Sequence, residues 1–511
     1  MTAARTLRNW RLQPTPDIRK LSCGWVFRPL GYGSVRWIRK AARLRYISTR
    51  GEAPELEFDD VLLAGLARDG GLYVPEDWPK LDENTLRSLR GLPYAQLAAR
   101  VLSPFVGDRI REDDFADLVS DAYETFDHDA IAPLKQLDPS LWLMELFHGP
   151  TLAFKDFAMQ LLARLFDHVI KKRGERITLI GATSGDTGSA AIEACRGTDS
   201  VDIFILFPDG RVSEVQRRQM TTVQAPNVHT IAIEGTFDDC QDLVKAMFND
   251  LRFRDEMRLS AVNSINWCRV MAQIVYYVHA ALSLGAPDRP VSFSVPTGNF
   301  GNVFAGYAAG QMGLPIDQLI VGSNANDILT RFFADCDMSI KEVVPTLSPS
   351  MDIQVSSNFE RLLFELCGHD GDAVSRLMEA FRRTGRLDVD REAWALSREL
   401  FDGHAMDDNA TKTAIKAFAN ATGEIVDPHT AIGLVAAAAR RRDPAVPVVA
   451  LATAHPAKFP DAVTEAVGRA PALPRHLEDL YQRDERMAVL PNDRSAIQGF
   501  IRDHVDLRGA A

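Results

Sequence analysis

Short runs of Val, Ile, Leu and Phe alternate with helical patterns through the middle of the chain. Each run has the length of a buried strand, and a loop or turn separates it from the next helical pattern. Helical patterns begin at about Ser189, at Ser213 and after Thr236, which offers an N-cap. Strands that alternate with helices are typical of βαβ units and a parallel sheet. The predicted strands are residues 177–180, 201–207, 229–233, 291–295 and 319–322.

The pattern differs on both sides of this region. Residues 56–68 have apolar side chains at helical spacing, and residues 72–74 have the pattern of a short strand. The helical stripe consists of Phe58, Val61, Leu62 and Leu66. Residues 331–424 carry helical stripes without the alternation, which predicts a mainly helical insertion. After Asp427 the α/β pattern returns, with a helix through Ala439 and a strand over residues 446–451.

These patterns predict an α/β fold in which parallel sheets are flanked by helices in two α/β domains, with an N-terminal region and a helical insertion. Ligands of such sheets bind at the carboxyl ends of the strands. The predicted segments are 45–130 for the N-terminal region, 131–330 for the α/β core with a smaller subdomain at about 170–290, 331–424 for the insertion, 425–470 for the return to the core, and 471–511 for a peripheral C-terminal segment.

Composition restricts the class of protein. Of 511 residues, 46% are hydrophobic and 25% charged, as in ordinary globular proteins. The net charge of −11 argues against a nucleic-acid binder. No apolar run reaches the roughly 18 residues of a membrane span. Six scattered cysteines form neither a disulfide framework nor a zinc pattern, so we expect no metal site and a reducing, cytoplasmic environment.

Residues 1–44 differ from the remainder in charge. They contain ten Lys or Arg and one acidic residue, a net charge of +9. This composition is that of an organelle transit peptide, but Pro and Gly interrupt any amphipathic helix. A disordered basic arm, or an extension outside the mature fold, is therefore favoured over a transit peptide.

Two glycine-rich loops follow predicted strands. The loop at 181–188 reads GATSGDTG and precedes a helix, so its backbone amides and the helix N-terminus favour an anion. The loop at 296–302 reads PTGNFGN and carries no charge, yet its backbone amides can surround a phosphate. Neither loop matches the dinucleotide or Walker pattern. Each is equally compatible with a tight turn or a capped helix start.

Two further segments carry reactive side chains. Lys155 lies between Phe154 and Phe157 at the front of an apolar helix. Most lysines are solvated surface groups, but one in apolar surroundings has the lowered pKa that a Schiff-base lysine needs. Thr453 follows the last predicted strand, where a hydroxyl is most often a cap. One amine, two neutral anion loops and one hydroxyl together suit pyridoxal phosphate, and they suit NAD poorly.

Eleven motifs occur in an order that is specific to one family. They are YISTR (46–50), DGGLYVP (69–75), ELFHGPT (145–151), FKD (154–156), SGDTG (184–188), NSIN (263–266), PTGNFGN (296–302), SPSMD (348–352), SNFER (357–361), DPH (427–429) and TAHP (453–456). Over residues 46–470 the chain resembles the threonine synthases of the longer bacterial and fungal type, in the fold-type-II family of pyridoxal-phosphate enzymes. Residues 1–44 have no counterpart in that pattern.

The resemblance implies roles for individual residues. Lys155 would hold pyridoxal phosphate through a carbon–nitrogen double bond, and Thr453 would lie beside the pyridine nitrogen. The cofactor phosphate would be held by Gly298, Asn299, Phe300, Gly301 and Asn302. The substrate carboxylate or the 3′-oxygen of the cofactor would face Ser184, Asp186 and Thr187, and the substrate phosphate would be gripped by Asn263 and Arg269. Many relatives have Asn at the position of Asp186, so the role of Asp186 stays open. The roles of His148 and His455 also stay open.

The implied reaction converts O-phospho-L-homoserine and water to L-threonine and phosphate, the last step of threonine biosynthesis, in a monomer or homodimer without nucleic-acid or membrane partners. Movement of the domains on substrate binding is expected, because water must be excluded early. Two alternatives stay open. One is a related phospho-lyase that forms a keto acid from O-phosphoserine or O-phosphohomoserine. The other is a non-catalytic protein that binds phosphorylated ligands on the same scaffold, against which an intact Lys155 argues.

Overall fold

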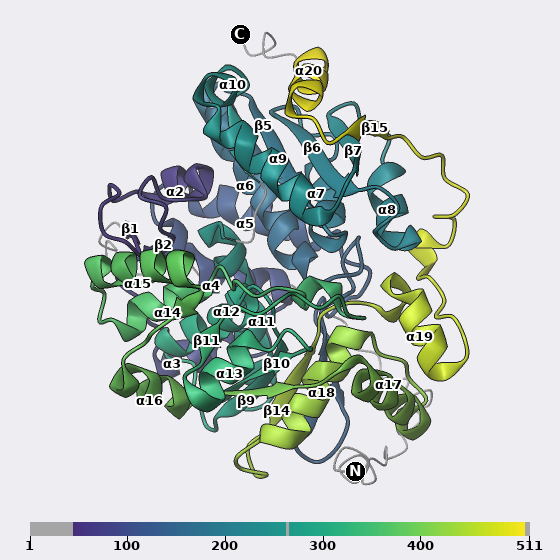
Figure 1. Cartoon of the computed structure of the whole chain (residues 1–511). Helices are drawn as coiled ribbons and strands as arrows, with labels where there is room; N and C mark the ends of the chain where they lie inside the picture. Colours follow the sequence, from purple (N-terminus) through teal and green to yellow (C-terminus); the bar gives the residue numbers. More distant parts are fainter. Residues whose placement is uncertain (1–43, 262–264, 506–511) are drawn as a thin grey trace, which may run out of the picture.

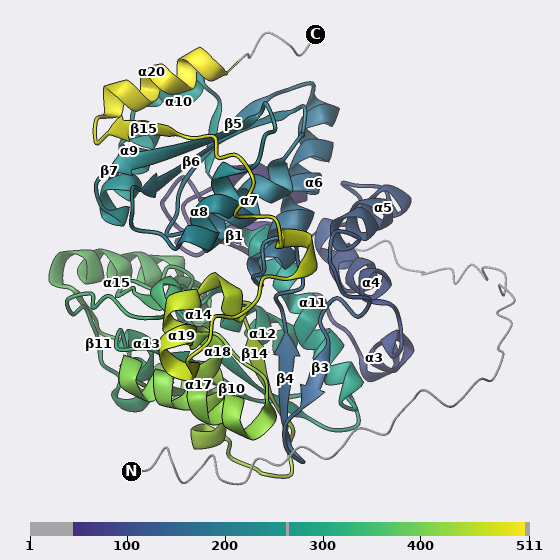
Figure 2. The ribbon, with the colours of Figure 1, turned by 90° about the vertical axis from the view of Figure 1, so that its right-hand side faces the viewer.

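The computed structural model describes residues 44–261 and 265–505 of the chain. The predictions for residues 1–43 and for Asn263 therefore lie outside the described residues. Two parallel sheets occupy separate halves of the molecule, with an additional group of N-terminal helices beside them (Figures 1 and 2). No helix of residues 44–261 and 265–505 is long and apolar enough to cross a membrane.

The larger sheet has six strands in the order β13-β10-β9-β14-β4-β3. All neighbouring pairs are parallel except β3 with β4. In that order the strands are β13 (Phe401–Ala405), β10 (Ile316–Ser323), β9 (Val291–Pro296), β14 (Val448–Ala452), β4 (Leu141–Glu145) and β3 (Leu134–Gln136). The central strands β9 and β14 are buried along their whole length, as expected for a sheet covered on both faces.

The smaller sheet has five parallel strands in the order β15-β7-β6-β5-β8. These are β15 (Ala488–Pro491), β7 (Val228–Glu234), β6 (Val201–Pro208), β5 (Ile177–Ala182) and β8 (Leu259–Ala261). Every predicted strand of the central region is present, and the observed first and last residues differ from the predicted ones by at most three residues. Thr236 caps the following helix as predicted, because its hydroxyl accepts from the Asp239 backbone amide.

Helices connect the strands of both sheets. They are α6 (Lys155–Arg173), α7 (Asp186–Cys195), α8 (Glu214–Thr221), α9 (Phe237–Asn249), α10 (Leu251–Glu256), α11 (Trp267–Ser283), α12 (Gly301–Gln311), α13 (Ile328–Asp335) and α18 (Pro428–Arg440). Helix α11 packs against both α6 and α12 and is buried over most of its length. Helix α7 begins at Asp186, not at Ser189 as predicted. The glycine loop therefore continues directly into the first turn of the helix.

The N-terminal region comprises β1 (Tyr46–Ser48), α2 (Phe58–Ala64), β2 (Tyr73–Pro75), α3 (Glu83–Leu89), α4 (Tyr94–Val106) and α5 (Glu112–Tyr123). Strands β1 and β2 pair antiparallel, and α4 and α5 pack against α11 and α6, respectively. Leu66 was wrongly included in the apolar stripe of the first predicted helix, because it lies beyond the end of α2 and is 46% exposed. Helix α2 ends at Ala64 because Gly65 takes a positive φ of 62°.

Residues 331–424 contain the expected helices, namely α14 (Phe359–Leu366), α15 (Gly371–Thr384), α16 (Arg391–Leu400) and α17 (Asp408–Thr422). They also contain the strands β11 (Met338–Ser339) and β12 (Arg386–Leu387), which form a two-stranded sheet, and β13. Strand β13 pairs with β10 and extends the larger sheet. Its sequence FDGHA lacks β-branched residues, so no local signal predicted a strand there.

The C-terminal segment, predicted as peripheral over residues 471–511, adds an edge strand and a helix to the smaller sheet. After α19 (Pro460–Val467) the chain crosses to the smaller sheet, where β15 pairs with β7 (Figure 2). Helix α20 (Arg494–His504) then packs against α9, with Ile497 and Ile501 fully buried. The crossing segment was missed because it is rich in charged residues, and β15 has only four residues. Three short 3₁₀ turns are η3 (Pro349–Met351), η4 (Pro456–Lys458) and η5 (Arg475–Leu477).

Candidate active site

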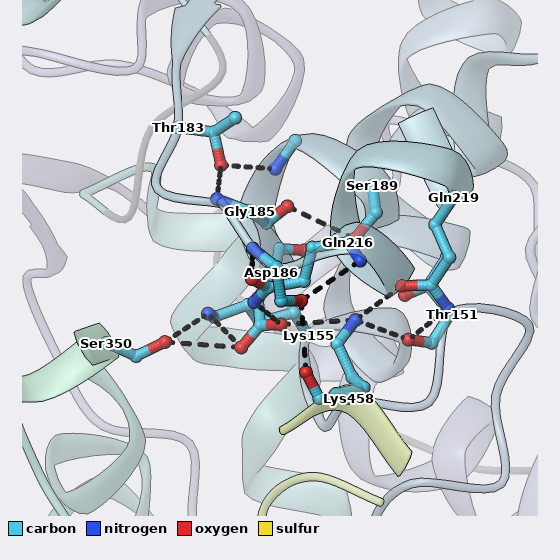
Figure 3. Close-up of polar contacts among 12 residues, drawn as sticks. Thr151, Lys155, Thr183, Gly185, Asp186, Ser189, Gln216, Gln219, Ser350 and Lys458 are labelled. Atoms are coloured by element: carbon cyan, nitrogen blue, oxygen red, sulfur yellow. Dashed lines mark hydrogen bonds and ion pairs between the residues drawn. The ribbon is translucent and has the colours of Figure 1, made fainter. Parts of the chain in front are cut away.

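Lys155 is the first residue of α6, directly beside the end of β14. The Phe154 backbone amide donates to the carbonyl of Thr453 at 2.9 Å, which ties the start of the helix to that strand end. The Lys155 ammonium lies 3.2 Å from Oδ2 of Asp186 and 3.3 Å from Oγ of Ser350 (Figure 3). The structure therefore brings together the lysine, the first glycine loop and the end of β14.

The Lys155 side chain is 11% exposed. Burial lowers the pKa of Lys155, the negative charge of Asp186 opposes that effect, and the positive charges of Lys458 and Arg269 add to it. Burial alone would raise the pKa of Asp186, but the charges of Lys155 and Lys458 hold it well below its usual value. A lysine with a lowered pKa loses its proton more readily than a solvated one, as a general base must.

The loop between β5 and α7 is built around close backbone packing. The Thr183 hydroxyl accepts from the amides of Gly185 and Gly188, at 3.0 and 2.9 Å. Gly185 has a φ of 133°, and a Cβ there would lie 2.4 Å from the Gln216 side chain. Gln216 in turn donates to Oδ1 of Asp186 at 2.9 Å. Only glycine allows this approach, which orients the Asp186 carboxylate.

Two predicted residues of this loop differ from Asp186 in exposure. Ser184 and Thr187 are partly exposed, whereas the Asp186 side chain is 5% exposed. Ser184 precedes the helix and Thr187 lies in its first turn. Of the three predicted residues of this loop, Ser184 and Thr187 are thus the two that are partly accessible.

The second glycine loop connects β9 to α12. A Cβ on Gly298 would lie 2.7 Å from the carbonyl oxygen of Ser350, so this loop and Ser350 pack closely. Phe300 takes the left-handed conformation with φ 63° and precedes the helix that starts at Gly301. The carbonyl of Asn299 accepts from the backbone amide and the side-chain amide of Asn358, at 3.1 and 3.0 Å.

Asn302 occupies the first turn of α12. Its Oδ1 accepts from the hydroxyls of Tyr276 and Tyr277, at 2.5 and 2.9 Å. Its Nδ2 is buried and has no hydrogen-bond partner within the described residues. A buried amide without a partner is costly, and a bound acceptor removes that cost.

Arg269 lies in the first turn of α11 and is 5% exposed. Burial lowers the pKa of Arg269 to about 10. Among residues 44–261 and 265–505, neither Nε nor Nη1 has a hydrogen-bond partner. Asn263, the residue predicted to act with Arg269, lies outside the described residues. The neighbouring Cys268 is buried, and burial raises the pKa of its thiol, as expected of an inert cysteine.

The two histidines beside the motifs have local partners. Nε2 of His148 lies 2.7 Å from the Glu145 carboxylate. His455 accepts from the Ala457 amide at 3.1 Å, and burial lowers its pKa to about 4. Within the described residues, no group of three or more His, Cys, Asp or Glu side chains could hold a metal ion.

Sequence reasoning missed three residues of the site. Ser350 contacts both Lys155 and Asp186, Gln216 orients Asp186, and Lys458 lies 3.1 Å from Oδ1 of Asp186. Ser350 lies within the motif SPSMD, and Lys458 lies two residues after the motif TAHP. Their side chains carried no local signal, because their partners lie far away in the sequence.

Three families match successive parts of the chain. Residues 45–123 match the family described as "Threonine synthase N terminus", residues 127–453 match "Pyridoxal-phosphate dependent enzyme", and residues 430–501 match "Threonine synthase, C-terminal". The threonine synthase of Pseudomonas aeruginosa is 59% identical over 462 residues, covering 90% of this chain and 98% of that protein.

Solved structures agree with these matches. A structure of pyridoxal-phosphate-bound threonine synthase from Brucella melitensis has 54% identity and a TM-score of 0.89, and covers 91% of this chain and 100% of that one. Yeast threonine synthase has 37% identity and a TM-score of 0.86, and covers 91% and 99%. The chain therefore belongs to the threonine synthase family of pyridoxal-phosphate-dependent enzymes.

Proposed function

We propose that this chain converts O-phospho-L-homoserine and water to L-threonine and phosphate, with Lys155 as the residue that carries the cofactor and moves protons. The observation that carries the proposal is the buried Lys155 amine, 3.2 Å from Asp186, at the meeting point of two glycine loops and a strand end. An amine in these surroundings suits Schiff-base chemistry, which an exposed lysine does not.

The residues present fit pyridoxal phosphate. The loop at 298–302 offers backbone amides at the N-terminus of α12, where the helix dipole favours a phosphate. Nδ2 of Asn302 is a buried donor without a partner among the described residues, as a site for an anion requires. Thr453 is 5% exposed and follows β14, so its hydroxyl suits a pyridine nitrogen without forcing a full positive charge on it. We therefore assign Gly298, Asn299, Phe300, Gly301, Asn302 and Thr453 to the cofactor.

When bound, pyridoxal phosphate supplies an electron sink for the carbon next to the substrate amine. Lys155 would remove the proton from that carbon, because burial lowers its pKa and so favours the neutral amine that a base must be. Ser184 and Thr187 would orient the substrate carboxylate, while Asp186 holds the Lys155 amine in place. These positions keep the reacting groups aligned and exclude water before the phosphate leaves.

Arg269 suits the phosphate of the substrate. Its guanidinium is buried, and two of its nitrogens lack partners within the described residues. A planar guanidinium binds phosphate through two parallel hydrogen bonds, which specify the position of the leaving group. We propose that Arg269 binds this phosphate, together with Asn263.

Division of the core into two lobes supports a closing movement. The lobe with the smaller sheet carries Asp186 and Gln216, and the lobe with the larger sheet carries Thr453 and the loop at 298–302. Lys155 begins the helix between them. We propose that substrate binding draws the lobes together, which removes water from the site.

Product analysis tests the proposed function. Purified enzyme is incubated with O-phosphohomoserine and, separately, with O-phosphoserine, and threonine, keto acid and phosphate are measured together. We expect one threonine for each phosphate released from O-phosphohomoserine. A keto acid as the main product from either substrate would favour the phospho-lyase, and the absence of turnover with both would favour a binding protein.

Substitution of Gly298 by Ala tests the proposed phosphate loop. The added methyl group would lie 2.7 Å from the Ser350 carbonyl and 3.1 Å from Cα of Met351, both backbone atoms that cannot move independently. Such overpacking costs about 1–3 kcal/mol and displaces the loop. We expect roughly 10-fold weaker binding of pyridoxal phosphate, measured by fluorescence titration of the cofactor-free chain. Gly310→Ala in the helix α12 that follows this loop, where a Cβ would have a contact of 3.8 Å, is the control and should bind normally.

A further inference from the structure

Lys458 is a fully buried lysine that no step of the proposed reaction uses. It ends the turn η4, directly after the strand end that carries Thr453, and its side chain has 0% exposure. Its ammonium donates to the carbonyl of Thr151 at 2.7 Å and to Oε1 of Gln219 at 2.8 Å, and it forms an ion pair with Oδ1 of Asp186 at 3.1 Å (Figure 3). Two neutral oxygens and one carboxylate oxygen suit a charged ammonium, which has donors only.

The two neutral acceptors of Lys458, on Thr151 and Gln219, are held in place by further hydrogen bonds. Gln219 donates its own amide to the Thr151 carbonyl at 3.1 Å, which points its oxygen at Lys458. Thr151 is held by Asp156, whose carboxylate accepts from both the amide and the hydroxyl of Thr151. The oxygens of Thr151 and Gln219 that face Lys458 are therefore oriented by contacts that do not involve the Lys155 side chain.

Two lysines share one carboxylate. Oδ1 of Asp186 faces Lys458 and Gln216, and Oδ2 faces Lys155 and Ser350. Each oxygen thus has one cation and one neutral donor. Lys155 must lose its charge to react, and at that moment Asp186 loses one of its two cations. A buried carboxylate left without any cation costs several kcal/mol, so without Lys458 the chain would resist deprotonation of Lys155.

We propose that Lys458 is a positioning residue, a permanent counter-ion of Asp186 that allows Lys155 to become neutral while the carboxylate stays paired. The role of Lys155 rests on the proposed function, but the pairing itself does not. The same arrangement keeps the Asp186 carboxylate oriented after Lys155 has left it. A lysine here, and not a neutral residue, is needed because Asp186 stays negatively charged.

Other charged groups near the two lysines act in fixed directions. Arg269 on α11 adds positive charge and lowers the pKa of Lys155 together with Lys458. His429 on α18 favours the charged form of Asp186. Asp156 on α6 is buried, and burial raises its pKa to about 6, although the charge of Lys458 opposes this. None of these groups contacts Asp186 as closely as Lys458 and Gln216 do.

The experiment measures the pH at which Lys155 loses its proton. The full chain is stripped of cofactor and treated with an amine-modifying reagent at a series of pH values, and modification of Lys155 is quantified by peptide mass spectrometry. In Lys458→Met we expect the midpoint to rise by about one pH unit or more, which corresponds to about tenfold less reactive amine below the midpoint. Equal midpoints in the two folded proteins would overturn the proposal.

Two further variants separate charge from packing. Asp186→Asn should lower the midpoint below that of the wild type, because no carboxylate then favours the charged amine. In the Asp186→Asn background, Lys458→Met should move the midpoint much less than it does alone, because no carboxylate is left for Lys458 to pair. A shift as large as in the presence of Asp186 would show that Lys458 acts only by repelling the charge of Lys155, and it would overturn the proposal. If Lys458→Met alone does not fold, Lys458→Gln replaces it in both backgrounds.

A surface lysine provides the matched control. Lys412 pairs with Glu465 at 2.6 Å on the outside of the molecule, so Lys412→Met should leave the Lys155 midpoint unchanged. In the holoenzyme, the acid limb of the pH profile of kcat/KM should move upward in Lys458→Met only. A wild-type chain that forms no threonine, with the midpoint still shifted in Lys458→Met, would refute the proposed function and support the pairing.

Discussion

Replacement of Lys155 by Ala is expected to reduce threonine formation by at least about 1,000-fold while the fold stays intact. The amine would both carry the cofactor and move the proton at the reacting carbon, and general acid–base catalysis alone contributes up to about 10,000-fold. Ala keeps helix α6, because Ala is the best helix former and the side chain of Lys155 does not cap it. The measurement is the initial rate of threonine formation at saturating O-phosphohomoserine and cofactor.

Circular dichroism and thermal unfolding of Lys155→Ala would establish that the fold survives. Removal of Lys155 leaves Asp186 paired with Lys458 and Gln216, so the melting temperature should change little. Lys135→Ala is a useful control, because this lysine is 42% exposed and pairs with Glu145 and Glu424 away from the glycine loops. Threonine formation by Lys155→Ala at near the wild-type rate would refute the role of this lysine.

The elements that carry the site were predictable because their signals are local. A run of buried β-branched residues followed by a glycine-rich turn identifies a strand, the loop and the start of the next helix within about 20 residues. The segments 181–188 and 296–302 are such loops, and both lie where the sequence placed them. Lys155 was found in the same way, from the apolar residues on both sides of it.

The partners of these residues were not predictable, because their contacts join distant parts of the chain. Ser350 is 195 positions from Lys155, in a segment whose sequence indicates neither a strand nor a helix. Lys458 lies two residues after the motif TAHP that contains Thr453, but a lysine is by default a solvated surface residue. Only the fold shows that three acceptors surround it.

The two sheets were predicted, but not their edges. Strands β13 and β15 are short and poor in β-branched residues, and each is stabilised mainly by pairing with a neighbour that the local sequence does not indicate. Both join the edge of a sheet whose neighbouring strands had been predicted, although the interior strand β4 of the larger sheet was missed as well. Central strands are recognisable because both faces are buried, whereas edge strands depend on tertiary context.

Replacement of Arg269 by Ala is expected to raise KM for O-phosphohomoserine by roughly 10- to 100-fold, since a hydrogen bond to a charged group contributes about 1.5–3 kcal/mol. The two guanidinium nitrogens that lack partners in the described part of the chain would bind the substrate phosphate. Affinity for pyridoxal phosphate should stay within about twofold, because the cofactor phosphate is assigned to the loop that begins at Gly298. Steady-state kinetics and cofactor titration measure the two effects separately.

Further variants test whether the guanidinium acts through its shape or only through its charge. Arg269→Lys keeps the charge but cannot form two parallel hydrogen bonds, so it should recover only part of the affinity. Inorganic phosphate should inhibit the wild type as a competitor and inhibit Arg269→Ala much more weakly. Arg164→Ala is the control, because this arginine is also partly buried and, among residues 44–261 and 265–505, donates hydrogen bonds only to Gln160 within α6. A selective loss of pyridoxal phosphate in Arg269→Ala would instead place Arg269 at the cofactor, and the substrate phosphate would then need another cation.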